Sequence, residues 1–425
     1  MDVEMQSVPF DPAKAKATLA QLPHAPAVFA LYGADYKDQP YIGRTPNLRG
    51  RLERLLQPSP KHPRRLQLAG RVRRIAWHLT GSDFESLLTQ FEMLEKAYGP
   101  KALERMHLGA PAFVRFLGSN PYPRVTITNK PSQREADWAY GPFASRAAAE
   151  RFAEEMLKLF LLRRCTDDLN PDPSHPGCVY SEMKMCLAPC YKGCTDERYA
   201  EESAAVQQFL ATRGESKLVV LRAARDKASE DLAFEDASAM HAQVQKVEAV
   251  RALAPELVQP MSTLRAAVLQ ASANPDEVAV FVYEAGRLRG PVPFSTIGMR
   301  IQNEQSGSSS LFAQPMALEP VPEEQGSGMR DQASENLGAA KIPRTMLEER
   351  MQTVLEQLKT ASDPPNATIR QANLALLKRW YYRPEVKREG EVVFPDAEGH
   401  WPLRALLRAA GRVAARSFAP SSLRH

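Results

Sequence analysis

The sequence lacks any apolar stretch long enough to cross a membrane, because no run approaches the roughly 18 residues that a spanning helix needs. Its first ten residues, MDVEMQSVPF, also lack the basic segment followed by an apolar core that marks a secretory signal. Both absences predict a cytoplasmic protein, in a compartment where thiols stay reduced.

Cysteine is scarce: the 425-residue chain has five, and all lie between positions 165 and 194. In a reducing compartment such clustering favours a metal or iron–sulfur site over disulfides. The spacing of four of them suits tetrahedral Zn²⁺ or a cubane iron–sulfur cluster, and these are Cys165, Cys178, Cys186 and Cys190. Cys194 is then a spare thiol or an alternative ligand. The competing interpretation is a set of buried cysteines that bind nothing.

The chain as a whole also lacks a large net charge, since its formal net charge is only +5. The basic residues are nevertheless concentrated, and the stretch 44–74 contains a single acid, Glu53. A local basic surface is typical of phosphate binding, so this stretch predicts contact with double-stranded DNA. The expected contact residues are Asn47, Arg49, Arg54, Arg64, Arg65, Arg73 and Arg74. The alternative is an ordinary solvated helix face.

Hydrophobic periodicity predicts a mixed α/β chain. Residues 22–43 indicate two strands joined as a hairpin, followed by a helix that Asn47 can cap, a strand at 71–79 and a helix at 83–97. A strand at 124–128 and a helix at 146–160 follow before the cysteines, and residues 200–252 indicate two helices separated at Gly214. A hairpin is predicted at 278–294 with its turn at Ala285-Gly286, and helices at 344–359, 366–380 and near the C-terminus.

Residues 22–56 resemble the GIY-YIG nuclease domain, in particular the version at the N-terminus of the bacterial excinuclease subunit UvrC. The match rests on Tyr41-Ile42-Gly43 and on Asn47-Leu48-Arg49-Gly50-Arg51-Leu52. The resemblance implies an α+β domain with a small three-stranded antiparallel sheet and flanking helices. It also implies a Mg²⁺-dependent DNA endonuclease, with Tyr41 and Arg51 at catalytic positions and Arg44 in place of the family lysine.

Three family positions are substituted. Phe29 replaces the tyrosine of the first strand, Gln90 replaces the metal-binding glutamate, and Leu103 replaces a late asparagine. Gln90 offers Mg²⁺ only a neutral oxygen, whereas Mg²⁺ sites prefer carboxylates. Glu85, Glu92 and Glu95 lie off its face of the helix, so none is an obvious replacement. We therefore expect a nuclease site that is dead or impaired.

The resemblance to UvrC continues to about residue 295. The cysteine spacing resembles the segment that in the family carries a 4Fe-4S cluster, which leaves Zn²⁺ as the alternative. The sequence around Phe234-Glu235 resembles the UVR motif, a helical hairpin that docks on the helicase subunit UvrB. The expected partner-binding residues are Leu232, Phe234, Glu235, Ala237 and Val244. The competing interpretation of their apolar stripe is an internal helical hairpin.

These patterns divide the chain into seven predicted segments. They are a GIY-YIG nuclease-like domain at 1–107, a small α/β connection at 108–160, the cysteine segment at 161–198, the UVR-like hairpin at 199–254, a short β-containing segment at 255–302, a flexible linker at 303–342 and a helical basic region at 343–425. No ribonuclease H-like or helix-hairpin-helix pattern is found at 344–425. The sequence thus predicts a UvrC-like DNA-binding protein of nucleotide excision repair. The alternatives are an active single-cut endonuclease and a cluster-based redox sensor.

Overall fold

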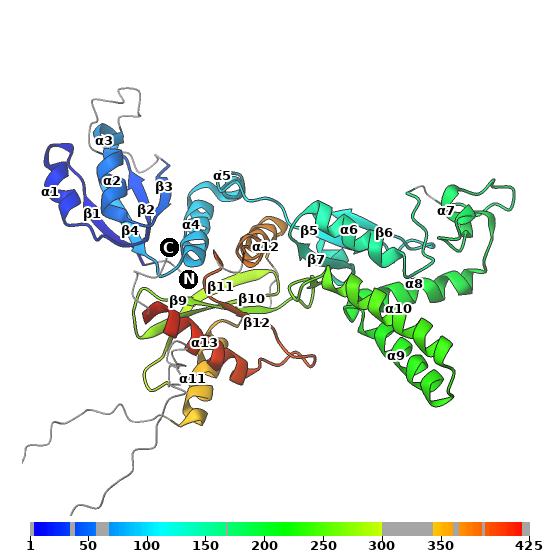
Figure 1. Ribbon diagram of the computed structural model, residues 1–425. Coiled ribbons are helices and arrows are strands. Elements are labelled where there is room, and N and C mark those ends of the chain that lie inside the picture. The colour runs from blue at the N-terminus through cyan, green and yellow to red at the C-terminus, as the bar shows by residue number, and fades with distance from the viewer. Residues whose placement is uncertain are drawn as a thin grey trace, which may run out of the picture.

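The computed structural model describes residues 4–34, 39–56, 68–166, 169–299, 343–359, 365–384 and 387–418. The predicted linker at 303–342 lies outside these residues, as do Arg64 and Arg65 of the basic stretch. The described chain forms a mixed α/β structure around three four-stranded antiparallel sheets (Figure 1). No helix among the described residues is long and apolar enough to span a membrane.

The first sheet has the strand order β1-β4-β2-β3. Its strands are β1 (Gln6–Pro9), β2 (Ala27–Tyr32), β3 (Tyr41–Thr45) and β4 (Arg74–Leu79). The prediction of three strands was wrong, because β1 pairs with β4 at the sheet edge. β1 is mostly exposed and has no apolar alternation, which explains why the pattern did not reveal it. Helices α1 (Ala15–Ala20), α2 (Leu48–Leu56) and α3 (Leu68–Arg71) accompany this sheet.

The second sheet has the order β6-β5-β7-β8. Its strands are β5 (Ala112–Phe116), β6 (Val125–Thr128), β7 (Ala139–Phe143) and β8 (Gln259–Pro260). Helix α6 (Arg146–Leu157) packs its buried residues against β5, and helix α8 (Asp196–Ala211) belongs to the same apolar core. The cysteine segment with the short helix α7 (Val179–Glu182) extends from the far end of this unit (Figure 1).

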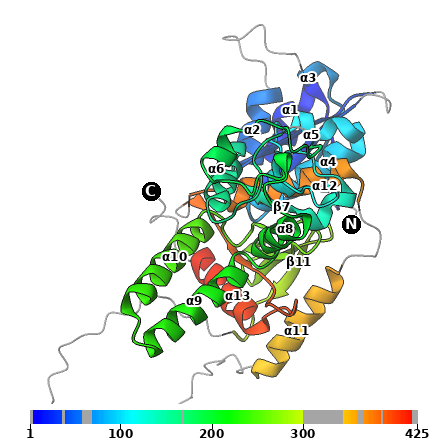
Figure 2. The same cartoon turned by 90° about the vertical axis from the view of Figure 1, so that its right-hand side faces the viewer.

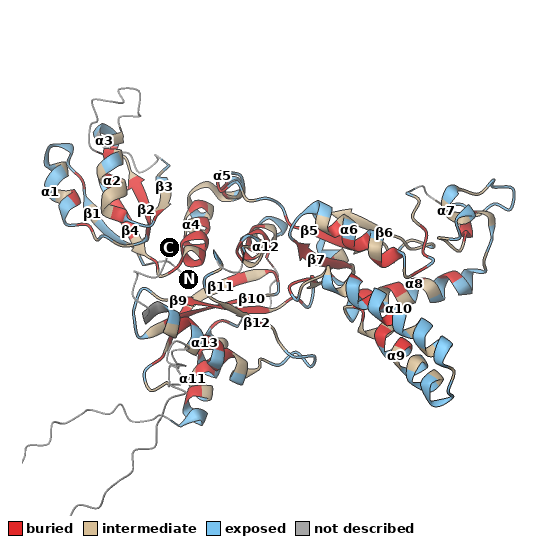
Figure 3. Ribbon diagram, viewed as in Figure 1, coloured by how far each residue is buried: buried red, intermediate tan, exposed pale blue. Residues whose placement is uncertain are grey.

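Residues 200–252 form parts of three helices, although two were predicted. The predicted break is present, since α8 ends at Ala211 and Gly214 directly precedes α9 (Glu215–Glu230), but a second break separates α9 from α10 (Phe234–Ala252). At this break Leu232 adopts a left-handed backbone with φ of 59°. Neither Gly nor Pro marks the position, so no turn signal is present in the sequence there. Helices α9 and α10 project from the second unit as a hairpin, and its tip is exposed (Figure 3).

The third sheet has the order β11-β10-β9-β12. Its strands are β9 (Ala266–Ala271), β10 (Glu277–Glu284), β11 (Arg287–Ser295) and β12 (Glu391–Val393). The hairpin β10–β11 confirms the prediction at 278–294, with Ala285 and Gly286 at the turn. β12 adds a strand from the region predicted to be helical, so segments on both sides of residues 303–342 build one sheet.

Helices cover both faces of the third sheet. Residues that alternate along its strands divide between two apolar cores, with Phe281 in one and Val280 in the other. The first core includes α4 (Asp83–Tyr98) and α12 (Ala367–Tyr381), and the second includes α11 (Arg344–Gln357) and α13 (Leu403–Phe418). Both views show α4 and α12 above the sheet and α11 and α13 below it (Figures 1 and 2). Helix α4 also contacts β2 and β3, and therefore joins the first sheet to the third.

Candidate functional site

The tyrosine strand and the strand beside it form a closely packed pair. In the antiparallel register Phe29 lies opposite Gly43, and the rings of Phe29 and Tyr41 are 6.1 Å apart. A Cβ added to Gly43 would lie 2.9 Å from Cζ of Phe29, so glycine is needed for this approach. The Phe29 ring is buried, whereas Tyr41 is 42% exposed. Of the two aromatic family positions, only position 41 therefore presents a hydroxyl to solvent.

Helix α2 begins as the sequence predicts. The Asn47 side-chain oxygen accepts a hydrogen bond from the Gly50 N–H at 3.0 Å, which caps the helix. The Arg49 Nε–H donates to the Leu22 carbonyl at 2.7 Å, and the Arg54 Nε–H donates to the Gly50 carbonyl at 2.9 Å. Both guanidinium groups are thus oriented by backbone oxygens. Arg51 is half-exposed and forms no ion pair with any described residue.

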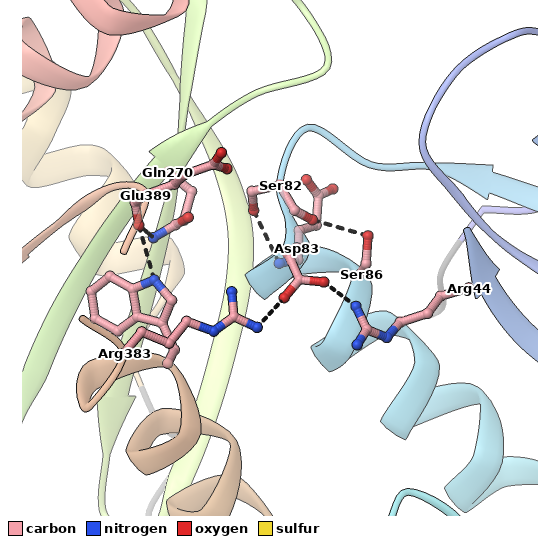
Figure 4. Close-up of polar contacts among 9 residues, drawn as sticks. Arg44, Ser82, Asp83, Ser86, Gln270, Arg383 and Glu389 are labelled. Atoms are coloured by element: carbon pink, nitrogen blue, oxygen red, sulfur yellow. Dashed lines mark hydrogen bonds and ion pairs between the residues drawn. The ribbon is translucent and has the colours of Figure 1, made fainter. Parts of the chain in front are cut away.

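Arg44 has a partner that the family resemblance did not suggest. Its guanidinium forms an ion pair with Asp83, the first residue of α4, and Asp83 also pairs with Arg383 after α12 (Figure 4). Burial opposes ionisation of Asp83, but the bonds from Arg383 and Arg44 outweigh it and hold the pKa of this carboxyl below its usual range. Arg44 is therefore ion-paired within the protein, although one carboxylate shared between two guanidinium groups leaves a net charge of +1.

Helix α4 places Gln90 on the side of the tyrosine strand. Gln90 lies seven residues after Asp83, which is two helical turns, so both residues share the face directed at Arg44. At the other end of α4 the Tyr98 hydroxyl donates to the Pro40 carbonyl just before β3. Leu103, at the third substituted position, packs against the apolar core around α4. The position that the GIY-YIG resemblance assigns to a metal ligand thus carries an amide in this chain.

The neighbouring glutamates are used elsewhere. Glu85 is buried, accepts a hydrogen bond from the Gly81 N–H at 2.8 Å and lies 3.8 Å from His78 Nε2. The nearby Glu85 carboxylate is the main reason that the pKa of His78 is raised. Glu92 and Glu95 line a cavity of about 260 Å³ against β11 and α12, and burial raises the pKa of Glu92 to about 7. None of the three occupies the position of Gln90.

The rest of the predicted DNA-binding surface is only partly described. Arg73 donates to the carbonyl oxygens of Gly70 and Val72, both at 2.8 Å. The Arg74 guanidinium lies over the Tyr32 ring, 4.0 Å from its centroid. Such stacking leaves the edges of a guanidinium available to phosphate oxygens. Arg73 and Arg74 thus form a basic surface on the described part of this domain.

The four predicted cysteine ligands lie together. Cys165, Cys178, Cys186 and Cys190 line one cavity of about 10 Å³, and Cys194 does not line it. The Ala188 N–H donates to Cys186 Sγ at 3.3 Å, and Arg163 Nη1 donates to Cys165 Sγ at 3.6 Å. Donors of this kind stabilise negative charge on sulfur. The residues that the spacing selected are therefore the ones that the fold brings together.

The cavity has the donor set of a metal centre but not a finished geometry. Burial raises the pKa of Cys186 to about 11 and also raises that of Cys190, so these thiols are protonated at neutral pH in the absence of a cation. Within the described residues no three His, Cys, Asp or Glu side chains already stand in positions that hold a metal ion.

The apolar stripe of α10 divides between the inside and the outside of the molecule. Leu232 and Phe234 at the hairpin tip are 71% and 67% exposed, and Glu235 beside them is exposed as well. Ala237 is half-buried, whereas Val244 is only 3% exposed and belongs to the apolar core of the second unit. Val244 packs inside the molecule and is therefore not part of the exposed tip with which it was grouped.

Comparisons with known proteins relate part of this chain to UvrC. The model of the UvrC/Cho excinuclease middle domain matches residues 113–212, which include the cysteine cavity. The UvrABC system protein C of Aliivibrio fischeri is 27% identical over 239 residues, covering 56% of this chain and 38% of that protein. The corresponding protein of Haemophilus ducreyi is 29% identical over 240 residues, with the same coverage. This chain is related to UvrC over that part of its length. No solved structure matches it.

The chain spans about 38% of the length of these UvrC relatives. The residues assigned from the GIY-YIG resemblance do not include Asp83 and Arg383, which lie 300 residues apart and meet beside Arg44. The only local signal was Ser82, which caps α4 and so places Asp83 in its first turn. Their meeting depends on how α4 and α12 pack on the third sheet, which no local pattern specifies.

Proposed function

We propose that this chain is a UvrC-like DNA-binding protein of nucleotide excision repair that docks on a UvrB-type helicase subunit and does not cut DNA. The observation that carries the proposal is the match of residues 113–212 to the UvrC middle domain, together with the four-cysteine cavity inside that range. The basic surface of the first unit and the exposed hairpin tip supply the contacts that such a protein requires.

The proposed loss of cutting follows from the chemistry at three positions. Phosphodiester hydrolysis needs an activated water and positive charge on the phosphorane, and a bound metal usually supplies both. Phe29 is buried without a hydroxyl, Gln90 has no negative charge for Mg²⁺, and Arg44 is already paired with Asp83. Tyr41 is exposed and Arg51 is half-exposed, and both are suited to holding a phosphate.

The cysteine cavity would hold a thiolate-bound 4Fe-4S cluster or Zn²⁺. Such a centre, when bound, would act as a cross-link that fixes the loops of residues 165–190. Arg163 and the Ala188 N–H would then donate to the sulfurs, as they do in the structure. The family resemblance favours the cluster, and Zn²⁺ is the alternative that the same four thiolates suit.

Salt-dependent DNA binding tests the proposal. The protein should bind lesion-bearing duplex with an affinity that falls steeply with salt, because bound phosphates release their counterions. Replacing Arg64, Arg65, Arg73 and Arg74 with Gln should lower the logarithmic salt slope by about 0.9 for each phosphate that the variant no longer binds. The absence of duplex binding at low salt, with or without UvrB, would refute the proposal.

The second candidate is an active endonuclease that makes a single incision near a lesion. It is supported by the exposed Tyr41 on β3 and by Arg51 on α2, the two residues that the GIY-YIG resemblance assigns to catalysis. Incision that disappears on Arg51→Ala replacement would favour this candidate over the first.

A further inference from the structure

Helix α13 carries a row of arginines on its outer face. Arginine recurs every fourth residue, and the four members, called here the α13 arginine row, are Arg404, Arg408, Arg412 and Arg416. All four are exposed, and the helix contains no acidic residue. Residues four apart lie on the same side of an α-helix, so the row is continuous over about 18 Å.

The opposite face of α13 is fixed against the protein. Leu406, Ala410 and Val413 are at most 3% exposed and pack in the core beneath the third sheet. The row therefore points away from the sheet, and the helix cannot turn without exposing this core. The surface also lies on the far side of the sheet from α4, which contacts the first unit (Figures 1 and 2).

The two halves of the row differ in how they are paired. Glu391 of β12 binds Arg412 through both carboxylate oxygens at 3.2 Å and lies 3.3 Å from Arg416. Neither Arg404 nor Arg408 forms an ion pair with a described residue, although the Arg408 Nε–H donates to the Arg404 carbonyl at 3.4 Å. The row thus keeps excess positive charge, mostly in its first half, where the helix N-terminus adds to the positive potential.

We propose that the α13 arginine row binds the phosphates of duplex DNA as a second binding surface, separate from the basic stretch of the first unit. The inference rests on the DNA binding of the proposed function and assigns a role to α13 within it. Along about 18 Å one DNA strand presents about five phosphates, so the length of the row matches a short stretch of backbone. Arginine favours such contacts because its planar fork can bind phosphate through two N–H groups.

An anionic membrane is the other large phosphate surface, and the packing of α13 argues against it. Helices that bind membrane surfaces bury an apolar face among the lipids. The apolar face of α13 is already buried against β9, β10 and α11, which leaves only charge for a membrane. Duplex DNA, in contrast, is bound mainly through charge.

The test compares three variants in DNA binding at several salt concentrations. Arg404→Gln with Arg408→Gln should lower the logarithmic salt slope by about 1.8, because this variant no longer binds two of the phosphates. The matched pair Arg404→Lys with Arg408→Lys should largely keep the slope. Glu391→Gln should bind more tightly than the unmodified protein, since it releases Arg412 and Arg416 from their shared carboxylate.

The outcomes separate this inference from the proposed function. If the unmodified protein binds duplex and the double Gln variant has the same salt slope and affinity, DNA binding by α13 is refuted and the proposed function stands. If the unmodified protein does not bind duplex at all, the proposed function fails first. Vesicles of phosphatidylglycerol and phosphatidylcholine are the second arm, and row-dependent capture by them with unchanged DNA binding would also overturn the inference. Equal thermal unfolding of all variants shows that the replacements act at the surface.

Discussion

Asp83 at the start of α4 is ion-paired with Arg44 of β3, so the helix that carries Gln90 is attached at its first turn to the strand that carries Tyr41. The same carboxylate binds Arg383, which follows α12 on the third sheet. Asp83 therefore connects the first unit with segments that lie 300 residues later in the chain. The chain is also tightly packed two residues before Asp83, because a Cβ added to Gly81 would lie 2.2 Å from the Ser272 carbonyl carbon.

Replacing Asp83 with Asn should destabilise this junction. The side chains of Arg44 and Asp83 are 30% and 35% exposed, so solvent screening limits the expected loss to about 1 to 2 kcal/mol in the free energy of unfolding. Urea titration followed by circular dichroism measures the change. Double-mutant cycles with Arg44→Gln and Arg383→Gln should show non-additive losses, because each pair shares the Asp83 carboxylate.

Glu150→Gln is the matched control for Asp83→Asn. Glu150 also pairs with an arginine, Arg146, but both side chains are more exposed, at 44% and 57%. An exposed pair of this kind contributes roughly 0.5 kcal/mol or less. Equal losses for Asp83→Asn and Glu150→Gln would show that the Asp83 junction has no special role.

The protonation of Glu92 should make stability depend on pH. Burial raises the pKa of Glu92 from its ordinary value of 4.5 to about 7, so between these values the folded protein holds a proton that the unfolded chain has released. Stability should therefore fall as pH rises through this window. Glu92→Gln should remove that part of the fall and stabilise the protein above pH 7 by about 1 to 3 kcal/mol. Parallel stability curves for the variant and the unmodified protein would contradict this assignment.

The exposed hairpin tip should bind the partner without supporting the fold. Phe234→Ala should abolish co-elution with UvrB, because a buried aromatic anchor contributes roughly 2 kcal/mol or more to a small interface. It should leave the melting temperature unchanged, since Phe234 is 67% exposed. Val244→Ala is the contrasting variant and should cost about 1 to 3 kcal/mol of stability, because Val244 is buried. Normal co-elution of Phe234→Ala would assign the tip no part in docking.

The cysteine cavity should carry metal when the protein is purified without oxygen. A 4Fe-4S cluster would give a brown protein with broad absorption near about 400 nm, whereas Zn²⁺ would give a colourless one. Cys190→Ser should lose the metal, and Cys194→Ser should keep it because Cys194 does not line the cavity. Iron, sulfide and zinc analysis of the three proteins decides the matter. Metal-free protein that is as stable as any loaded form would contradict the proposed centre.

Local patterns predicted most helices and strands because their boundaries depend on nearby residues. Asn47 caps α2 through the Gly50 N–H, and the turn at Ala285-Gly286 closes the hairpin β10–β11. The missed elements depend on distant partners instead. β1 forms only because β4 offers it an edge, and β12 forms because β9 does the same. A three-residue strand such as β12 carries too little pattern to be recognised alone.

In the candidate sites too, features set by nearby residues were predicted and features that depend on distant residues were not. Cysteine spacing selected four thiols that do line one cavity, because they are close in the chain. The apolar stripe of α10 placed Val244 with Phe234, yet one is buried and the other exposed. Periodicity identifies an apolar face but not what covers it, and here α9 and the second unit cover only the part beyond the tip.

Incision of damaged duplex is the most direct test of the claim that this site holds DNA without cutting it. The protein is incubated with UvrB, lesion-bearing duplex and Mg²⁺ or Mn²⁺, beside a variant carrying Phe29→Tyr and Gln90→Glu. Loss of general acid–base catalysis lowers the rate of cleavage by about 10² to 10⁴-fold. Loss of the metal carboxylate lowers the rate further, so the unmodified protein should give no detectable nick. A nick by the double variant alone would show that the fold keeps the geometry of a nuclease whose chemistry has decayed. A specific nick by the unmodified protein, abolished by Arg51→Ala, would contradict the account.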